Sequence, residues 1–124
     1  MRKDSAMDEN MKQELIDWGV NWSDISDRLM DNEALISKYM LKFINDSSFD
    51  ELSKALGDKN VEESFKACHK LKGVMGNLAL DGFKEPVLAL TEILRAGSFD
   101  GALELYEKIS IKYGQLIEIL KKYS

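Results

Sequence analysis

The only histidine of the chain, His69, lies in a segment over residues 65–80 whose apolar spacing is typical of a helix. Gly73 follows it by four residues and Gly76 by seven, so in a helix both glycines flank the imidazole. Three lysines surround it in sequence, Lys66, Lys70 and Lys72. A single accessible imidazole beside flexible cations is suited to carry a phosphoryl group reversibly.

The helical phase places the histidine away from the expected core. At about 100° per residue, one broad apolar stripe collects Val61, Phe65, Cys68, Leu71, Met75 and Leu78. His69 lies about 120° from the centre of this stripe, with Gly73 about 40° and Gly76 about 20° away on its two sides. Each glycine inside a helix costs about 1 kcal/mol relative to alanine. We favour steric clearance for the imidazole as the reason for both, with close helix packing through small residues as the alternative.

The lysines differ in what they can do for a phosphoryl group. Lys66 and Lys72 each stand three residues from His69, so both can lean over its ring. Lys70 is interpreted as an ordinary solvated residue, and the same interpretation is open for the whole cluster. In a chain with a formal net charge of −5, the cluster still concentrates positive potential where a phosphate would sit.

Other chemistries lack the residues that they need. One histidine and one cysteine, adjacent in sequence, cannot supply the three or four ligands of a zinc site. Cys68 falls in the apolar stripe and is expected in the core. The chain has neither a Gly-x-x-x-x-Gly-Lys-Ser/Thr loop nor a dinucleotide fingerprint. We therefore expect no metal or cofactor on this chain, and any phosphoryl group on His69 must come from a partner.

Composition sets the broad class. A length of 124 residues allows one core and not two, and 44% hydrophobic with 31% charged residues indicates a globular chain. No apolar run approaches the roughly 20 residues that cross a bilayer, and the start lacks a secretory signal pattern. A single cysteine suits the reducing cytosol, and a pI near 4.9 argues against a general nucleic-acid binder. We expect a small, soluble, cytoplasmic domain that binds neither membrane nor nucleic acid.

Helix punctuation dominates the rest of the chain, and sustained strand alternation is absent. Ser48 and Glu51 have capping-box spacing, as do Asn60 and Glu63, and Gly57 is expected in the left-handed position after a helix. Helices are predicted from about 8 to 18, 23 to 30, 32 to 44, 48 to 56 and 60 to 80, then one ending near 96 before Gly97, and a last one from Ser98 or Phe99 almost to Tyr123.

Short links between the last four segments predict an all-α fold, an antiparallel up-down-up-down four-helix bundle. The short N-terminal helices are expected to cap one end of it through their apolar residues, Trp18, Val20, Trp22, Ile25 and Leu29. The domain prediction is a flexible N-terminus over residues 1–7 followed by one helical bundle domain over residues 8–124.

The run His69-Lys-Leu-Lys-Gly73, followed by Gly76-Asn-Leu-Ala-Leu80, resembles histidine-containing phosphotransfer (HPt) domains. The signature of that family has a histidine, a lysine three residues on, a glycine four on, and then a pattern of small residues and leucine. His69, Lys72 and Gly73 occupy the first three places. The family typically has glycine where this chain has Ala79, and residues from about 30 to 123 fit its bundle.

The resemblance implies a carrier in a two-component phosphorelay, without ATP binding or autokinase activity. His69 would accept a phosphoryl group from an aspartate of a receiver domain and pass it to another receiver. Lys72 would steady the phosphoryl charge and Gly73 would keep the approach open, with Lys66 and Gly76 in support. The Mg²⁺ ion would belong to the receiver, which is part of a hybrid histidine kinase or a downstream regulator.

The resemblance also implies a polar residue on the next helix that bonds the second ring nitrogen and so sets the orientation of the imidazole. Spacing places Thr91 nearest that role, with Arg95 one turn on, although the family often has glutamine where Thr91 stands. A modest apolar patch near the histidine should dock the receiver. Its candidates are Val74, Met75 and Phe83, and Met75 is more readily interpreted as core.

Besides the phosphotransfer domain of a chemotaxis kinase, a close variant that shares the bundle and the motif, two other functions stay open at this point. One is a non-catalytic helical adaptor or docking domain in which His69 is an incidental surface residue. The other is the phosphoacceptor and dimerisation domain of a sensor kinase, which typically has an acidic residue directly after the histidine, where this chain has Lys70. That domain is an obligate dimer, whereas we expect a monomer here.

Overall fold

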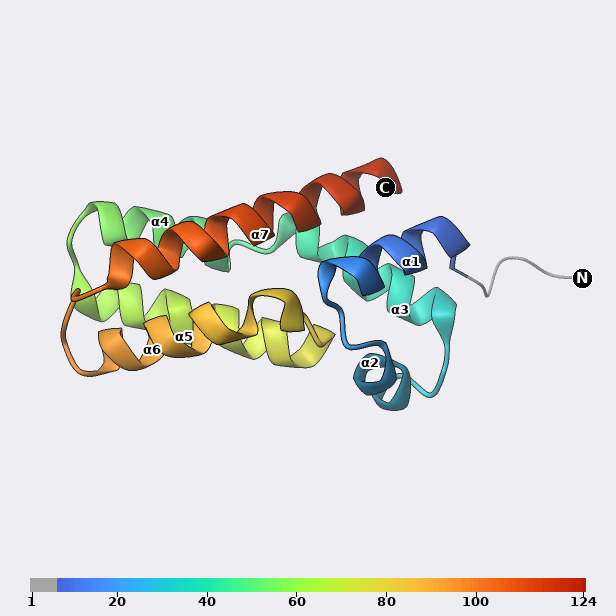
Figure 1. Ribbon diagram of the computed structural model, residues 1–124, viewed down its shortest axis with the longest axis horizontal. Helices are drawn as coiled ribbons and strands as arrows, with labels where there is room; N and C mark the ends of the chain where they lie inside the picture. Colours follow the sequence, from blue (N-terminus) through green and yellow to red (C-terminus); the bar gives the residue numbers. More distant parts are fainter. Residues whose placement is uncertain (1–6) are drawn as a thin grey trace, which may run out of the picture.

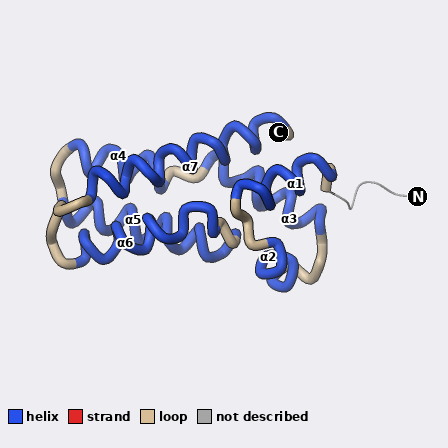
Figure 2. Tube along the Cα trace, in the orientation of Figure 1, coloured by secondary structure: helices blue, strands red, loops and turns tan. Residues whose placement is uncertain are grey.

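The computed structural model describes residues 7–124, and all regular structure in that range is helical (Figures 1 and 2). The prediction of an all-α fold is therefore confirmed for these residues. The flexible N-terminus expected over residues 1–7 falls outside the described residues except at Met7. That side chain is buried, and its backbone N–H donates to the Glu33 carboxylate at 3.2 Å.

The helices follow the chain in this order: α1 (Glu9–Trp18), α2 (Trp22–Arg28), α3 (Glu33–Lys42), the 3-10 turn η1 (Phe43–Asn45), α4 (Ser48–Gly57), α5 (Val61–Leu78), the 3-10 turn η2 (Asp81–Phe83), α6 (Lys84–Arg95) and α7 (Ala102–Lys122). Side-chain caps begin several of them. Asp8 accepts from the first backbone N–H groups of α1, Asn32 from Leu35 at 3.0 Å, and Asn60 from Glu63 at 3.0 Å. These caps satisfy N–H groups that the first helical turn leaves without partners.

Several predicted boundaries differ from the structure: three helices end two residues earlier than expected, at Arg28, Lys42 and Leu78, and two other boundaries have a local explanation. Gly57 ends α4 in place of following it, and Lys59 is the residue that takes the left-handed conformation, with φ 56°. The last helix starts at Ala102, three or four residues later than predicted, because the Asp100 N–H bonds the Ser98 hydroxyl at 3.0 Å in a local turn. Gly101, with φ 78°, then turns the chain into α7.

The core runs between α4, α5, α6 and α7 and continues into the end of the molecule formed by α1, α2 and α3. Each of the four long helices packs on the next along the chain. Each contributes fully buried aliphatic side chains, including Leu52, Leu71, Leu90 and Leu116. Aromatic rings join the first and last of the four, since Phe49 on α4 stacks on Tyr113 on α7 with ring centroids 4.0 Å apart. The backbone of α5 is thereby held between α4 and α6 with one face left outward.

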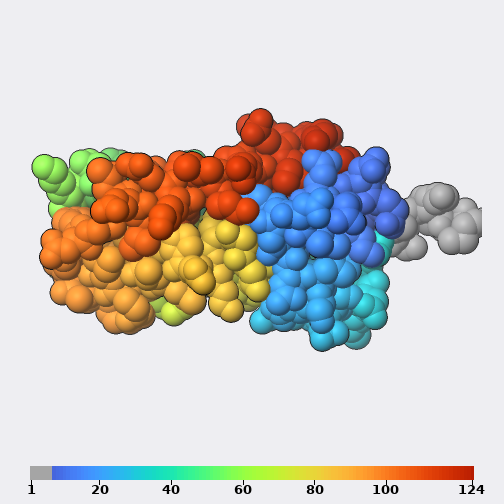
Figure 3. All heavy atoms as spheres, viewed as in Figure 1, coloured from blue at the N-terminus to red at the C-terminus, as the bar shows by residue number. Residues whose placement is uncertain are grey.

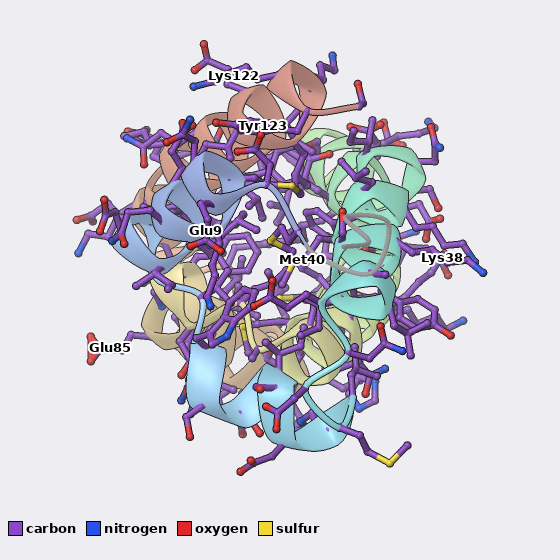
Figure 4. The ribbon with its side chains drawn as sticks, turned by 90° about the vertical axis from the view of Figure 1, so that its right-hand side faces the viewer. Glu9, Lys38, Met40, Glu85, Lys122 and Tyr123 are labelled. Carbon is purple, nitrogen blue, oxygen red and sulfur yellow. The ribbon has the colours of Figure 1, made fainter. Side chains whose placement is uncertain are left out.

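Helices α1, α2 and α3 gather at one end of the molecule (Figure 3). Trp18 anchors them: its indole N–H donates to the Lys112 carbonyl at 2.8 Å, and the Lys112 ammonium donates to the Trp18 carbonyl at 2.6 Å. A Cβ atom on Gly19 would lie 2.4 Å from the Gly82 Cα, so the two backbones meet where only glycine fits. Viewed from this end, Met40 points into the interior and Lys38 into solvent (Figure 4).

Among the helices that the structure describes, none combines the length and the apolar character needed to cross a membrane.

Candidate functional site

Helix α5 presents the histidine on its outward face. Cys68, Leu71 and Met75 are buried on the opposite face, as the apolar stripe predicts. His69, Gly73 and Gly76 are all exposed. Consecutive residues of a helix point about 100° apart, so His69 points away from the core that Cys68 enters.

The two glycines leave open space beside the ring. A Cβ atom built on Gly73 or on Gly76 would meet no atom within 4 Å outside its own helical turn. Interhelical packing through small residues, the alternative for these glycines, requires such contacts, so that interpretation is wrong.

An aromatic side chain occupies the N-terminal side of the histidine. The ring of Phe65, one turn earlier, lies 5.7 Å from the imidazole centroid with an angle of 46° between the planes. The Arg95 guanidinium from α6 lies 5.0 Å from the centre of the Phe65 ring and donates to Glu92 at 3.3 Å. Within residues 7–124, neither imidazole nitrogen of His69 has a hydrogen-bond partner, and the ring of Phe65 is its aromatic neighbour.

The three lysines have different partners. Lys66 pairs with Glu63 at 3.3 Å, one turn earlier on the same helix. Lys70 reaches α4, where it binds the Glu51 carboxylate at 2.9 Å and the Ser47 hydroxyl at 3.3 Å. Hydrogen bonds from Ser47 and then Lys70 hold the pKa of Glu51 below its usual value. Lys72 is half-buried and has no carboxylate partner within residues 7–124, which leaves its ammonium group available to an incoming anion.

Thr91 is not placed where the family resemblance implies. It is fully buried, and its hydroxyl donates to the Val87 carbonyl at 2.7 Å and lies 3.2 Å from the Cys68 sulfur. The cause is helical phase: Cys68 faces α6, and His69, one residue on, points about 100° away from it. The Thr91 hydroxyl therefore does not bond the imidazole, contrary to the expectation. Arg95 remains at the site, through its contact with Phe65.

Cys68 is a core residue, as expected. Its thiol is unpaired and fully buried, and burial raises its pKa. A protonated thiol beneath the outward face adds apolar packing and no nucleophile at neutral pH.

The expected docking patch is only partly present. Met75 and Phe83 are buried, with exposed fractions of 4% and 0%, so neither can contact a receiver. Val74 is half-buried and lines a shallow groove between α3, η1 and the end of α5. The apolar residues that line this groove are Leu29, Tyr39, Phe43, Val74 and Leu78.

Sequence reasoning missed Phe65, which it assigned to the buried stripe. The spacing of four residues before His69 was the available signal, because residues i and i+4 are neighbours on a helix surface. Within residues 7–124, no group of three or more histidine, cysteine, aspartate or glutamate side chains could hold a metal ion. No protein-family model, curated protein or solved structure matches the chain.

Proposed function

We propose that this chain is a histidine phosphotransfer protein that relays phosphoryl groups between receiver domains of a two-component system. One ring nitrogen of His69 attacks the phosphorus of a receiver aspartyl phosphate, while the other ring nitrogen keeps its proton. An N–P bond forms as the P–O bond to the aspartate breaks, and the carboxylate leaves with its electron pair. Attack by an aspartate of a second receiver on phosphohistidine reverses these steps.

The exposure of His69 beside Gly73 and Gly76 is the observation that carries this proposal. An acceptor that must meet an aspartyl phosphate inside a receiver pocket needs room for the surface of a second protein around its ring. A glycine inside a helix weakens it by about 1 kcal/mol relative to alanine, and α5 has Gly73 in its interior and Gly76 in its last turn. An added Cβ atom at either position would meet nothing within 4 Å, so packing against the rest of the molecule does not exclude a side chain there. Clearance for a docking partner gives them a reason.

Lys72 supports the same chemistry. It lies three residues from His69, on a neighbouring surface position of α5, without a competing carboxylate among residues 7–124. An ammonium group near the transferring phosphoryl stabilises the negative charge that its oxygens carry. Lys66 and Lys70 contribute to the local potential less directly, because each is already paired with a glutamate.

We also infer the topology of the bundle, from the lengths of its links and the order in which its helices pack. The links between α4 and α5, α5 and α6, and α6 and α7 are short, and consecutive helices pack on each other. Such connections favour an up-down-up-down antiparallel bundle with the N-terminal helices at one end.

As a carrier, the chain would act as a cytoplasmic monomer and would leave the metal chemistry to its partners. The Mg²⁺ ion and the reacting aspartate would reside in a receiver of a hybrid histidine kinase or of a downstream regulator. The chain would then be a substrate of each transfer step, and not an enzyme that hydrolyses or uses ATP.

The proposal is tested by incubating the protein with radiolabelled, phosphorylated receiver domains and Mg²⁺. Label should move from the receiver to the wild-type protein and be lost in acid while surviving base, as a phosphoramidate does. His69→Gln should stay unlabelled. An adaptor would instead bind a receiver and acquire no label, and that result for every receiver encoded in the same genome would overturn the proposal.

A further inference from the structure

An exposed histidine has to be held in one orientation if its ring nitrogen is to meet a phosphorus atom in line. Correct placement of reacting atoms accounts for a large part of the barrier in such reactions, and small displacements are costly. The Thr91 hydroxyl is engaged with Val87 and Cys68, so it does not hold the ring. The imidazole does have an aromatic neighbour, the ring of Phe65, with the two centroids 5.7 Å apart.

That aromatic ring is itself fixed. Phe65 is half-buried and packs against the hydrophobic core. Arg95 approaches it from α6, with its guanidinium carbon 5.0 Å from the ring centre, a distance at which a cation is attracted to an aromatic face. Glu92 binds Arg95 at 3.3 Å, one turn earlier on the same helix. The core and a tethered guanidinium therefore both restrict where the Phe65 ring can lie.

The direction of helical side chains makes this contact natural. Cα–Cβ bonds of a helix tilt toward its N-terminus, so the side chain of His69 leans over the preceding turn, where Phe65 is. In the following turn, Gly73 has no side chain, and a Cβ atom built on it would meet nothing within 4 Å. The imidazole thus lies against the Phe65 ring on its N-terminal side and beside the open space at Gly73 on its C-terminal side.

We propose that Phe65 is a positioning residue, which fixes the imidazole of His69 for phosphoryl transfer, and that Arg95 and Glu92 hold Phe65 in place. This inference rests on the proposed phosphotransfer function and adds to it the residues that orient the acceptor. The aromatic contact takes the place of a side-chain hydrogen bond to the ring. The partner's aspartyl phosphate would then approach from the side of Gly73, away from Phe65.

The test compares Phe65→Leu, which removes the ring but keeps an apolar side chain, with Phe65→Tyr, which keeps the ring. Phe49→Leu serves as the control, because it removes a buried aromatic side chain of α4 that stacks on α7 and does not contact His69. Transfer rates from a phosphorylated receiver are measured well below the melting temperature of every variant. In parallel, NMR records the ring-proton shifts of His69 and the order parameter of its ring C–H bond.

Phe65→Leu should shift the His69 ring-proton resonances, lower the order parameter and slow transfer about tenfold. Phe65→Tyr should keep all three within about twofold of the wild type, and Phe49→Leu should change melting temperature alone. A Phe65→Leu protein with wild-type ring order overturns the inference, as does one with a wild-type transfer rate. If wild-type protein accepts no label, the proposed function fails, and the ring-order comparison alone decides whether Phe65 orients His69.

Discussion

Replacing Gly73 by alanine should make this protein more stable. Gly73 is exposed in the middle of α5, and a Cβ atom built there meets nothing within 4 Å. Alanine at such a position restricts the unfolded chain and favours the helix, so the free energy of unfolding should rise by about 1 kcal/mol. For a chain of this size, that gain corresponds to a melting temperature about 3 to 6 °C higher.

Gly114 provides a matched control on another helix. It is an exposed glycine inside α7, and a Cβ atom there also meets nothing within 4 Å. Gly114→Ala should therefore raise the free energy of unfolding by the same amount, about 1 kcal/mol. Calorimetry or denaturant titration of both variants measures the two gains side by side.

A larger side chain should slow phosphoryl transfer at position 73 and leave it unchanged at position 114. Leucine at position 73 stands about 40° around the helix from His69 and would meet a docking receiver. If relieving that clash costs about 1 to 3 kcal/mol, transfer should slow by about fivefold to 150-fold. Gly114→Leu should transfer at the wild-type rate.

Two results would refute this reasoning. A Gly73→Leu protein that accepts phosphoryl groups as fast as Gly114→Leu would show that clearance beside His69 is not needed. A Gly73→Ala protein less stable than wild type would show that the surface beside the histidine is not open.

The lysines, the buried thiol and the Glu14 carboxylate each lead to a separate measurable outcome. Lys72→Ala should slow single-turnover transfer more than Lys70→Ala, because Lys70 is already paired with a glutamate at 2.9 Å; equal effects would contradict this. Cys68 should react with a disulfide reagent only when the chain unfolds, since its thiol is fully buried; rapid labelling of folded protein would show otherwise. Hydrogen bonds from Lys122 and Tyr123 lower the pKa of Glu14, and the bond to Glu14 raises the pKa of Tyr123 to about 12. The lowered carboxyl pKa adds stability above its ordinary value of 4.5 that is lost as pH falls, and the raised tyrosine pKa adds stability below its ordinary value of 10.0 that is lost as pH rises. Glu14→Gln should thus lower the melting temperature most between these values, and a pH-independent difference from wild type would disprove the link.

Local signals in the sequence predict most helices well. Asp8, Asn32 and Asn60 each cap a helix as their residue types suggest, because a short polar side chain satisfies free N–H groups. Gly57 misleads, since glycine permits the left-handed conformation without requiring it, and Lys59 adopts it instead. The start of α7 is missed because a turn from Ser98 to Gly101 competes with helix over the same residues.

The candidate site shows the same division. The outward position of His69 follows from helical phase, and the phase can be read from the residues of α5 alone. The neighbours that come from another helix do not follow from it. Thr91 was expected at the imidazole. It contacts Cys68 instead, because Cys68 faces α6 and His69 points about 100° away. The Arg95 contact with Phe65 depends on how α6 packs against α5, and pairwise spacing along one helix carries no information on that.

The identity of the phosphorylated atom is the most direct test of the central claim. Wild-type protein is incubated with a phosphorylated receiver and Mg²⁺, kept at alkaline pH, and sequenced by mass spectrometry with fragmentation that preserves the N–P bond. The account predicts one phosphoryl group per chain, located on His69 and lost on mild acid treatment. Phosphate on any other residue would contradict the account. So would a protein that takes up no phosphoryl group while the receiver loses its phosphoryl group only by hydrolysis.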